Sequence, residues 1–288
     1  MSWLDREIGK VEKGRLRKNG VKWFLAGIIV TIVLVVILSL FPYAQDGGVK
    51  VIRIEGTLTT GNVYGGGYAG SDYIGGEIRA AADDPLTDGI VLRINSPGGS
   101  PSASQEIIRD IEYAKEKNKP VVVSMGDMAT SAAYHVSSHS NRIFADPDTM
   151  TGSVGTIWTF YDNSESLDRE GVAVSVVKSG DLKDLGSSFR GLSDDELDYV
   201  QKMVDDSFEL FITDVLSQRN INRSDIEEAQ LIRGQDALKL GLVDEMGNMF
   251  DAIEYVKNYD KIKAAAKTDD ASNNNSSNNE SAGNSAQI

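Results

Sequence analysis

The sequence contains no cysteine and only two histidines, His135 and His139, among its 288 residues. Without cysteine there can be no disulfide, no thiolate nucleophile and no cysteine-ligated zinc. Two histidines are too few for most histidine-based metal sites, and no other pattern of metal ligands stands out. The glycine-rich stretch Gly65–Gly70 lacks the following Lys-Ser/Thr of a phosphate-binding P-loop. We therefore expect neither a metal nor a cofactor.

The chain also has fewer basic than acidic side chains. The formal charge is −14 at pH 7 and the isoelectric point is near 4.6, which argues against nucleic acid as a partner. The charge is unevenly distributed, because residues 1–22 carry seven basic and only three acidic side chains. This basic segment stands directly before the one long uncharged run of the chain.

Residues 23–44 contain no charged side chain and are almost entirely apolar. A helix of roughly 20 residues crosses a hydrocarbon core of about 30 Å, and Trp23 and Tyr43 stand at the ends, where such aromatics favour the interface. A cleaved signal peptide is the alternative, but its apolar region is usually about 7–15 residues long and ends in small residues. We expect an uncleaved single-pass transmembrane anchor, with residues 1–22 in the cytoplasm and the rest extracytoplasmic.

The remainder divides into a folded domain, residues 49–262, and a tail, residues 268–288, which is too polar to fold and is predicted to be disordered. Within the domain, apolar strand patterns alternate with helix patterns. This alternation predicts an α/β domain with a mostly parallel sheet and flanking helices. Strands are expected at 49–54, 89–94, 121–124 and 142–145, and helices at 71–82, 102–116, 130–138 and 192–218.

Ser131 stands among small residues where a predicted strand gives way to a helix. A serine there could cap the helix or pack tightly, or it could present its hydroxyl as a nucleophile. The segment Arg93–Ser100 also ends a strand, and its paired glycines, Gly98 and Gly99, could be a plain turn. Without Cβ atoms they could instead let backbone N–H groups approach a bound oxygen.

A serine hydroxyl needs a general base. His135 lies one helical turn after Ser131, but two residues so placed on one helix rarely align for proton transfer. Lys178 and Lys183 follow a strand-like stretch, Val172–Val177, in a loop rich in glycine and serine. A lysine acts as a base only when desolvation lowers its pKa, and a loop lysine is ordinarily solvated.

These motifs, in this order, resemble those of the signal peptide peptidase A (SppA) family, whose fold is shared with the Clp protease and the crotonases. The resemblance rests on RINSPGG, SMGDMATSAAYH, TGSVG, KSGDLKD with the downstream SFR, and GQDALKLGLVDEMG. It spans about residues 49–257. The family commonly has two glycines after the nucleophile, whereas this chain has Ala132-Ala133.

The resemblance implies a catalytic role for several residues. Ser131 would be the nucleophile and Lys183 the general base, with Ser153 orienting the lysine amine. The oxyanion hole would use the backbone of Gly98 or Gly99 and of Ala132. Lys178 would be structural.

The resemblance also implies a membrane-anchored serine endopeptidase that cleaves signal peptides and other unfolded peptides at the outer face of the membrane. Serine and lysine of such enzymes come from neighbouring protomers or repeats. Because this chain has one copy of the domain, we expect a homo-oligomeric ring with shared active sites. Two alternatives remain: a crotonase-like acyl-CoA enzyme, and a catalytically inactive membrane-bound scaffold or regulator.

Overall fold

The computed structural model describes residue 22, residues 27–33 and residues 48–265. Most of the predicted anchor, nearly all of the basic segment and the whole predicted tail lie outside these residues. Residues 27–33 are helical and exposed. Across the described part of the chain, no helix combines the length and apolar character needed to cross a membrane.

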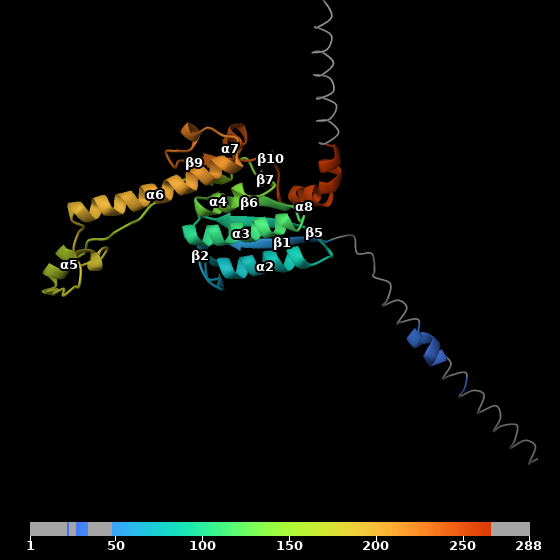
Figure 1. The fold of residues 1–288 in the computed structure, drawn as a ribbon, viewed down its shortest axis with the longest axis horizontal. Coiled ribbons are helices and arrows are strands. Elements are labelled where there is room, and N and C mark those ends of the chain that lie inside the picture. Colours follow the sequence, from blue (N-terminus) through green and yellow to red (C-terminus); the bar gives the residue numbers. More distant parts are fainter. Residues whose placement is uncertain (1–21, 23–26, 34–47, 266–288) are drawn as a thin grey trace, which may run out of the picture. The chain divides into compact units, whose positions relative to one another are not determined.

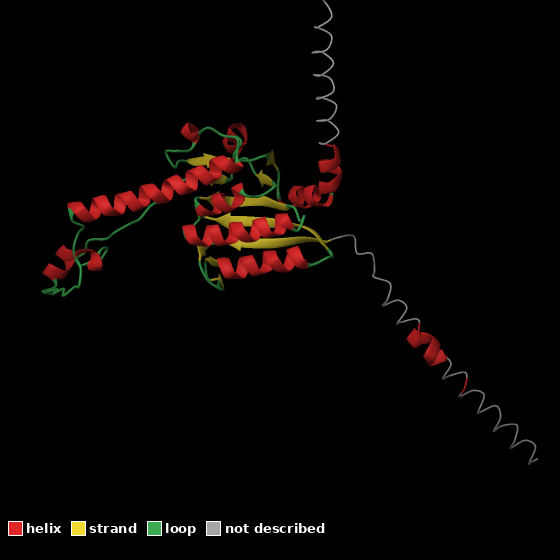
Figure 2. Ribbon diagram, viewed as in Figure 1, coloured by secondary structure: helices red, strands yellow, loops and turns green. Residues whose placement is uncertain are grey.

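From Gly48 onward the chain alternates strands and helices (Figures 1 and 2). The strands are β1 (Gly48–Glu55), β2 (Thr57–Thr59), β3 (Tyr64–Gly65), β4 (Tyr68–Gly70), β5 (Thr87–Ser96), β6 (Val121–Thr130), β7 (Arg142–Ala145), β8 (Met150–Gly152), β9 (Leu231–Arg233) and β10 (Glu245–Met246). The α-helices are α2 (Ser71–Asp83), α3 (Pro101–Glu116), α4 (Ala132–Ser138), α5 (Ser164–Arg169), α6 (Asp194–Gln218), α7 (Gly234–Leu240) and α8 (Met249–Lys257). Two short 3-10 helices are η1 (Asp181–Asp184) and η2 (Arg223–Asp225).

The main sheet has the order β1-β5-β6-β7-β10, and all of these neighbours pair in parallel. The far end of β6 also pairs in parallel with β8, which in turn pairs antiparallel with β9. A small second sheet has the order β2-β4-β3. The predicted class, an α/β domain with a mostly parallel sheet and flanking helices, is confirmed.

The central strand β5 shows why the sheet is covered on both faces. Ile90, Val91 and Leu92 are consecutive and fully buried, the pattern of a strand with helices on each side. Ile90 and Leu92 belong to the larger apolar core, which α2 and α3 line, whereas Val91 belongs to a smaller cluster with Ala252 and Val256 of α8. The sheet is therefore a rigid base for the loops at its carboxyl edge.

The long helix α6 has a well-defined start. Ser193 accepts a hydrogen bond from the Glu196 N–H, and the Glu196 carboxylate accepts one from the Ser193 N–H, so the two residues form a capping box. The carboxyl half of the helix packs on the body through Phe211, Ile212 and Val215, which are buried. Its amino end extends away from the sheet, towards α5 (Figure 1).

We call residues 157–205 the arm; it comprises α5, η1 and the first half of α6 (Figure 1). The arm contains no strand. The strand-like stretch Val172–Val177 is therefore not a strand, and the sequence pattern misleads at this point. Its residues are exposed, and no other segment of the described chain pairs with it. An apolar alternating pattern makes a strand only where a partner supplies the ladder of hydrogen bonds.

Candidate active site

Ser131 links the end of β6 to the start of α4 and has an unusual backbone. Its φ is 54° and its ψ is −127°, a conformation that costs a residue with a side chain on the order of 1–3 kcal/mol. Two backbone hydrogen bonds hold it, from the Ser131 N–H to the Gly152 carbonyl and from the His135 N–H to the Ser131 carbonyl, each 2.9 Å long. The Ser131 side chain makes no capping hydrogen bond. The residue is thus a strained, partly exposed serine and not a helix cap.

The glycine turn after β5 lies against this serine. A Cβ on Gly98 would be 2.8 Å from the Ser131 Cβ, and a Cβ on Gly99 would be 2.2 Å from the Leu58 carbonyl oxygen. Glycine is therefore required at both positions for close approach. The Gly98 N–H already donates to the Ser96 Oγ at 3.1 Å. Among the described residues no hydrogen-bond acceptor contacts the N–H groups of Gly99 and Ala132, so these two remain available to a ligand.

Strand pairing places Ser153 next to Ser131. The register of β6 with β8 sets Ala129 opposite Thr151 and Thr130 opposite Gly152, so the next residues on the two strands are Ser131 and Ser153. Ser153 also has a positive φ, 51°, and its N–H donates to the Gln230 carbonyl at 2.9 Å. Ser153, which the resemblance expects to orient the lysine amine, therefore lies beside Ser131 in the same chain.

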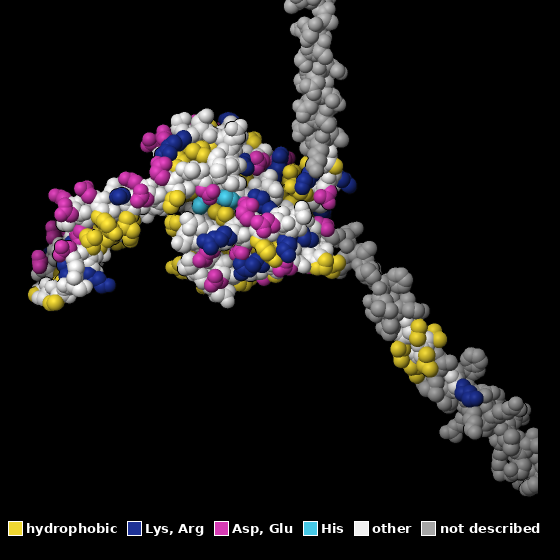
Figure 3. Space-filling model, in the orientation of Figure 1, with side chains coloured by type: hydrophobic (Ala, Val, Ile, Leu, Met, Phe, Trp, Pro, Cys, Tyr) yellow, Lys and Arg dark blue, Asp and Glu magenta, His cyan; other side chains and the backbone are white. Residues whose placement is uncertain are grey.

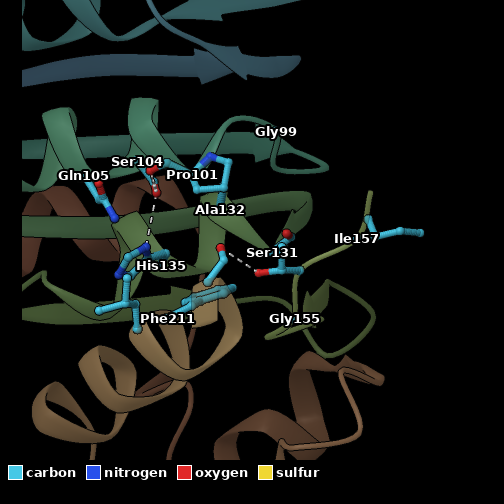
Figure 4. Close-up of a pocket in the computed structure, with 13 residues that line it drawn as sticks. Gly99, Pro101, Ser104, Gln105, Ser131, Ala132, His135, Gly155, Ile157 and Phe211 are labelled. Atoms are coloured by element: carbon cyan, nitrogen blue, oxygen red, sulfur yellow. Dashed lines mark hydrogen bonds between the residues drawn. The ribbon is translucent and has the colours of Figure 1, made fainter. Parts of the chain in front are cut away.

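A cavity opens beside Ser131, lined by Gly99, Ala132, Ile157 and Phe211, among others (Figure 4). His135 lies at its inner side, separated from Ser131 by Ala132 (Figure 4). The His135 ring does not hydrogen-bond the serine. Its Nδ1 is 3.1 Å from the Ser104 Oγ and its Nε2 is 2.6 Å from an Asp214 carboxylate oxygen. This geometry agrees with the sequence-based judgement that His135 is not the base.

Lys183 lies on η1 in the arm and does not line the cavity of Ser131. It is exposed, and its amine has no hydrogen-bond or ion-pair partner among the described residues. The structure of one chain therefore brings together Ser131, the glycine turn, Ala132 and Ser153, but not Lys183. The neighbouring lysine, Lys178, makes an ion pair with Asp184, which fits the structural role expected for it.

The backbone around Lys183 is held by a chain of ion pairs. Arg190 binds Glu196 through two hydrogen bonds of 2.6 and 2.7 Å, and Asp184 through two of 2.9 and 3.0 Å. The Arg190 guanidinium lowers the pKa of the Glu196 carboxyl to about 2 and holds that of Asp184 far below its usual value. Since Glu196 is in the first turn of α6, the network fastens η1 to the start of that helix. In the sequence, the motifs KSGDLKD and SFR marked Asp184 and Arg190 but not their link to Glu196.

A second polar cluster lies behind the serine, where His135, His139 and Asp214 place possible metal-ligand atoms within 4.8 Å of one another. The sequence showed no such set because Asp214 is 79 positions from His135. The available signal was the spacing of the two histidines, four residues apart at the end of a predicted helix. This cluster could hold a cation, and its side chains make no hydrogen bond to Ser131.

The arrangement around Ser131 belongs to a recognisable class. A serine in a strained turn between a parallel strand and a helix, next to free backbone N–H groups, is the geometry of a nucleophile in an α/β hydrolytic site. The profile of Peptidase family S49 matches residues 113–263. The chain belongs to this family, and the resemblance to SppA is confirmed.

Named relatives agree with this assignment. The chain is 35% identical to "Protease 4" of Salmonella typhi over 77% of this chain and 36% of that protein. It is 34% identical to "Protease 4" of Haemophilus influenzae over 73% of this chain and 34% of the relative. A "Putative signal peptide peptidase SppA" of Enterococcus faecium is 31% identical over 66% of this chain and 56% of the relative. The chain thus spans only about a third of the length of the two Protease 4 relatives.

One solved structure, a mutant of a membrane-bound stomatin-specific protease, aligns with a TM-score of 0.44 at 17% identity, covering 70% of this chain and 81% of that chain. A similarity of this size carries no argument about this chain.

Proposed function

We propose that this chain is a serine endopeptidase in which Ser131 is the nucleophile and Lys183 the general base. The observation that carries the proposal is the backbone of Ser131, because a strained serine beside two unpartnered amides has no structural purpose as a cap or packing residue. We also assign the domain to the Clp protease/crotonase-like fold. This assignment is supported by the mostly parallel sheet and by the motifs that the chain shares with SppA.

The mechanism follows from the groups around the serine. Neutral Lys183 takes the Ser131 proton, and Oγ attacks the carbonyl carbon of a peptide bond. The N–H groups of Gly99 and Ala132 stabilise the oxyanion, while Gly98 supports the turn. Lys183 then protonates the departing amine and activates the water that hydrolyses the acyl-enzyme. Ser153 holds the amine of Lys183 in place.

The lysine reaches the serine from a second copy of the chain, in a homo-oligomeric ring. Support comes from the arm, which carries Lys183 away from its own cavity and exposes apolar side chains. Ile157, Tyr161 and Val177 are 87%, 73% and 100% exposed, and Figure 3 shows apolar side chains gathered along the arm. Apolar surface of this extent is typical of an interface. The unpaired stretch Val172–Val177 would find its strand partner there.

The substrates we propose are signal peptides and other unfolded segments bound in an extended form, with small or apolar side chains next to the cleaved bond. The cavity beside Ser131 is lined in part by Ala132, Ile157, Leu210 and Phe211, which suits apolar side chains. Cleavage takes place at the outer face of the membrane, to which residues 23–44 anchor the enzyme. The Enterococcus faecium relative carries the name of a putative signal peptide peptidase.

The test is labelling of the full chain with a serine-directed fluorophosphonate, followed by mass mapping of the modified residue. The account predicts that Ser131 alone is modified, at a rate that rises with pH and falls in Lys183→Ala. Labelling at another serine, or no dependence on Lys183, would refute the assignment. A control variant, Lys202→Ala on α6, should label like the unmodified chain.

One observation favours a second candidate, an inactive scaffold: Lys183 is absent from the cavity of its own chain. That candidate predicts an assembled oligomer in which the fluorophosphonate does not label Ser131. A crotonase-like enzyme would be labelled by an acyl-CoA analogue instead.

A further inference from the structure

Two histidines and an aspartate meet between α4 and α6. His135 and His139 are 4% and 6% exposed. The Nε2 atoms of His135 and His139 lie 2.6 Å and 2.9 Å from the same Asp214 carboxylate oxygen. Figure 3 shows the edges of both histidines among acidic side chains at the base of α6. Nothing in the proposed peptidase mechanism uses this cluster.

The proton of His135 can be placed from its neighbours. The Ser104 hydroxyl donates its only hydrogen to the Pro101 carbonyl at 2.8 Å, so it can only accept from the His135 ring at 3.1 Å. His135 Nδ1 therefore carries a hydrogen. A neutral ring then has a bare lone pair on Nε2, pointing at a carboxylate oxygen that also carries only lone pairs. This contact is repulsive unless a positive charge lies between the two atoms.

His139 presents the same conflict. Its Nδ1 is 3.2 Å from a Glu112 carboxylate oxygen, and that oxygen also accepts from Lys115. A carboxylate cannot donate, so His139 Nδ1 also carries a hydrogen. The Nε2 of a neutral His139 would again face the Asp214 carboxylate without a proton. Both rings therefore require a positive species at the same point.

That species is either one added proton on each ring or a single cation bound by all three residues. Two protonated rings 5.9 Å apart, both almost completely buried, would repel each other. A single metal ion between the two Nε2 atoms and the Asp214 carboxylate removes both repulsive contacts and leaves both rings neutral.

We propose that His135, His139 and Asp214 bind one divalent transition-metal ion, for which Zn²⁺ is the best match. Two imidazole nitrogens and one carboxylate oxygen are a common zinc ligand set. Each ring also donates its Nδ1–H to an oxygen, Ser104 Oγ or the Glu112 carboxylate, which is how metal-bound histidines are normally oriented. A second cavity, lined by His135, Asp214 and Ser217, gives access from solvent and room for a water as the fourth ligand.

The ion would join two parts of the molecule. His135 lies on α4, which follows Ser131 directly, and His139 is the residue at which that helix ends. The His135 N–H also binds the Ser131 carbonyl. Asp214 belongs to the helix whose other end forms the arm. Bound metal would therefore fix the nucleophile helix to the base of the arm. Its role is structural, and no step of peptide cleavage passes through it.

The experiment uses the full chain, stripped with a chelator and titrated with ZnCl₂ in competition with a chromophoric chelator at pH 7.5. We expect one ion per chain, with affinity at least tenfold weaker in Asp214→Asn and in His139→Gln, and a higher melting temperature when zinc is bound. Asp206→Asn is the matched control, the same substitution on the same helix and beside the same cavity. It should bind zinc like the unmodified chain. Ser131→Ala should do so as well, which separates this proposal from the peptidase assignment.

A measurement on the unmodified chain removes any dependence on the folding of variants. Co²⁺ bound at the site should give the visible absorption of a four-coordinate ion with nitrogen and oxygen ligands. Histidine ¹⁵N spectra should show both rings metal-bound at Nε2 and protonated at Nδ1. The proposal is overturned if stoichiometric Zn²⁺ leaves both rings doubly protonated, or if the unmodified chain binds no more tightly than Asp214→Asn. Since the sequence has no cysteine and no third histidine, no other imidazole or thiolate set can mimic the result.

Discussion

The body of the domain and the arm hold their functional residues in different ways. Ser131 stands on a parallel sheet with helices on both faces, and hydrogen bonds from both neighbouring elements fix its strained backbone. Lys183 stands on a short 3-10 helix that a chain of ion pairs fastens to α6. The body therefore holds Ser131 on a packed sheet, whereas ion pairs hold the segment that carries Lys183 in the arm. An arm that exposes its apolar side chains and its lysine is suited to packing against another copy.

The largest predicted effect comes from removing either half of the proposed dyad. Ser131→Ala and Lys183→Ala should each lower kcat/KM for an unfolded peptide by at least ~10³-fold, since neither residue acts without the other. Neither substitution should alter the oligomer seen by analytical ultracentrifugation, because neither side chain packs in the core. Full activity in either variant would refute the assignment of that residue.

A smaller loss is expected when the ion-pair network of the arm is broken. Arg190→Ala removes the guanidinium between Asp184 and Glu196, so η1 is no longer held to α6. We expect kcat/KM to fall by about 10–100-fold, the usual cost of displacing a catalytic group by about 1 Å. The control is Arg169→Ala, also on the arm, whose ion pair with Glu165 is exposed and long at 3.7 Å. If both variants kept full activity, the network would have no positioning role.

A third prediction concerns the glycine turn after β5, which lies in the body of the domain. Gly98→Ala places a side chain at φ 96° and brings its Cβ to 2.8 Å from the Ser131 Cβ. We expect the free energy of unfolding to fall by about 1–3 kcal/mol, with a further loss of fluorophosphonate labelling. Gly76→Ala in α2 meets no atom within 4 Å and should stabilise the protein by about 0.4–1 kcal/mol. Equal effects of the two substitutions in chemical denaturation would contradict the account.

The smallest predicted effect is a loss of local stability in the arm at acid pH. The folded pKa of Glu196 is about 2, below its ordinary value of 4.5, and that of Asp184 is lowered as well. A depressed carboxyl pKa gives stability that is present above the unfolded value and is lost as pH falls through the folded value. Hydrogen exchange of amides in η1 and the first turn of α6 should therefore be constant from pH 8 to about 5 and accelerate below, after correction for intrinsic rates. Glu196→Gln should remove much of this change.

Local patterns predicted much of the body. The parallel sheet, the buried strand at 89–94, the helix at 102–116 and the capping box of Ser193 could all be read from nearby residues, because periodicity and capping act over a few positions. The strand-like pattern of 172–177 misled, since a strand also needs a partner that this chain does not provide.

Relations between distant residues were harder to predict. The meeting of Asp214 with two histidines depends on how α6 crosses α4, which no local pattern encodes. The motifs identified Gly98 and Gly99 together, but only the hydrogen bond to Ser96 shows that the Gly99 amide is the one left without a partner. The proposed pairing of each serine with a lysine from another chain would be a property of the assembly, which no pattern within one chain encodes.

The central claim is that a serine in one chain works with a lysine from another, and mixing two inactive variants tests it directly. Ser131→Ala and Lys183→Ala chains, dissociated, mixed in equal amounts and reassembled, should recover about a quarter of the unmodified peptidase activity, because about one interface in four then pairs an intact serine with an intact lysine. Each variant reassembled alone should remain inactive. If mixed rings assemble normally and remain as inactive as their parents at every ratio, the shared active site is contradicted.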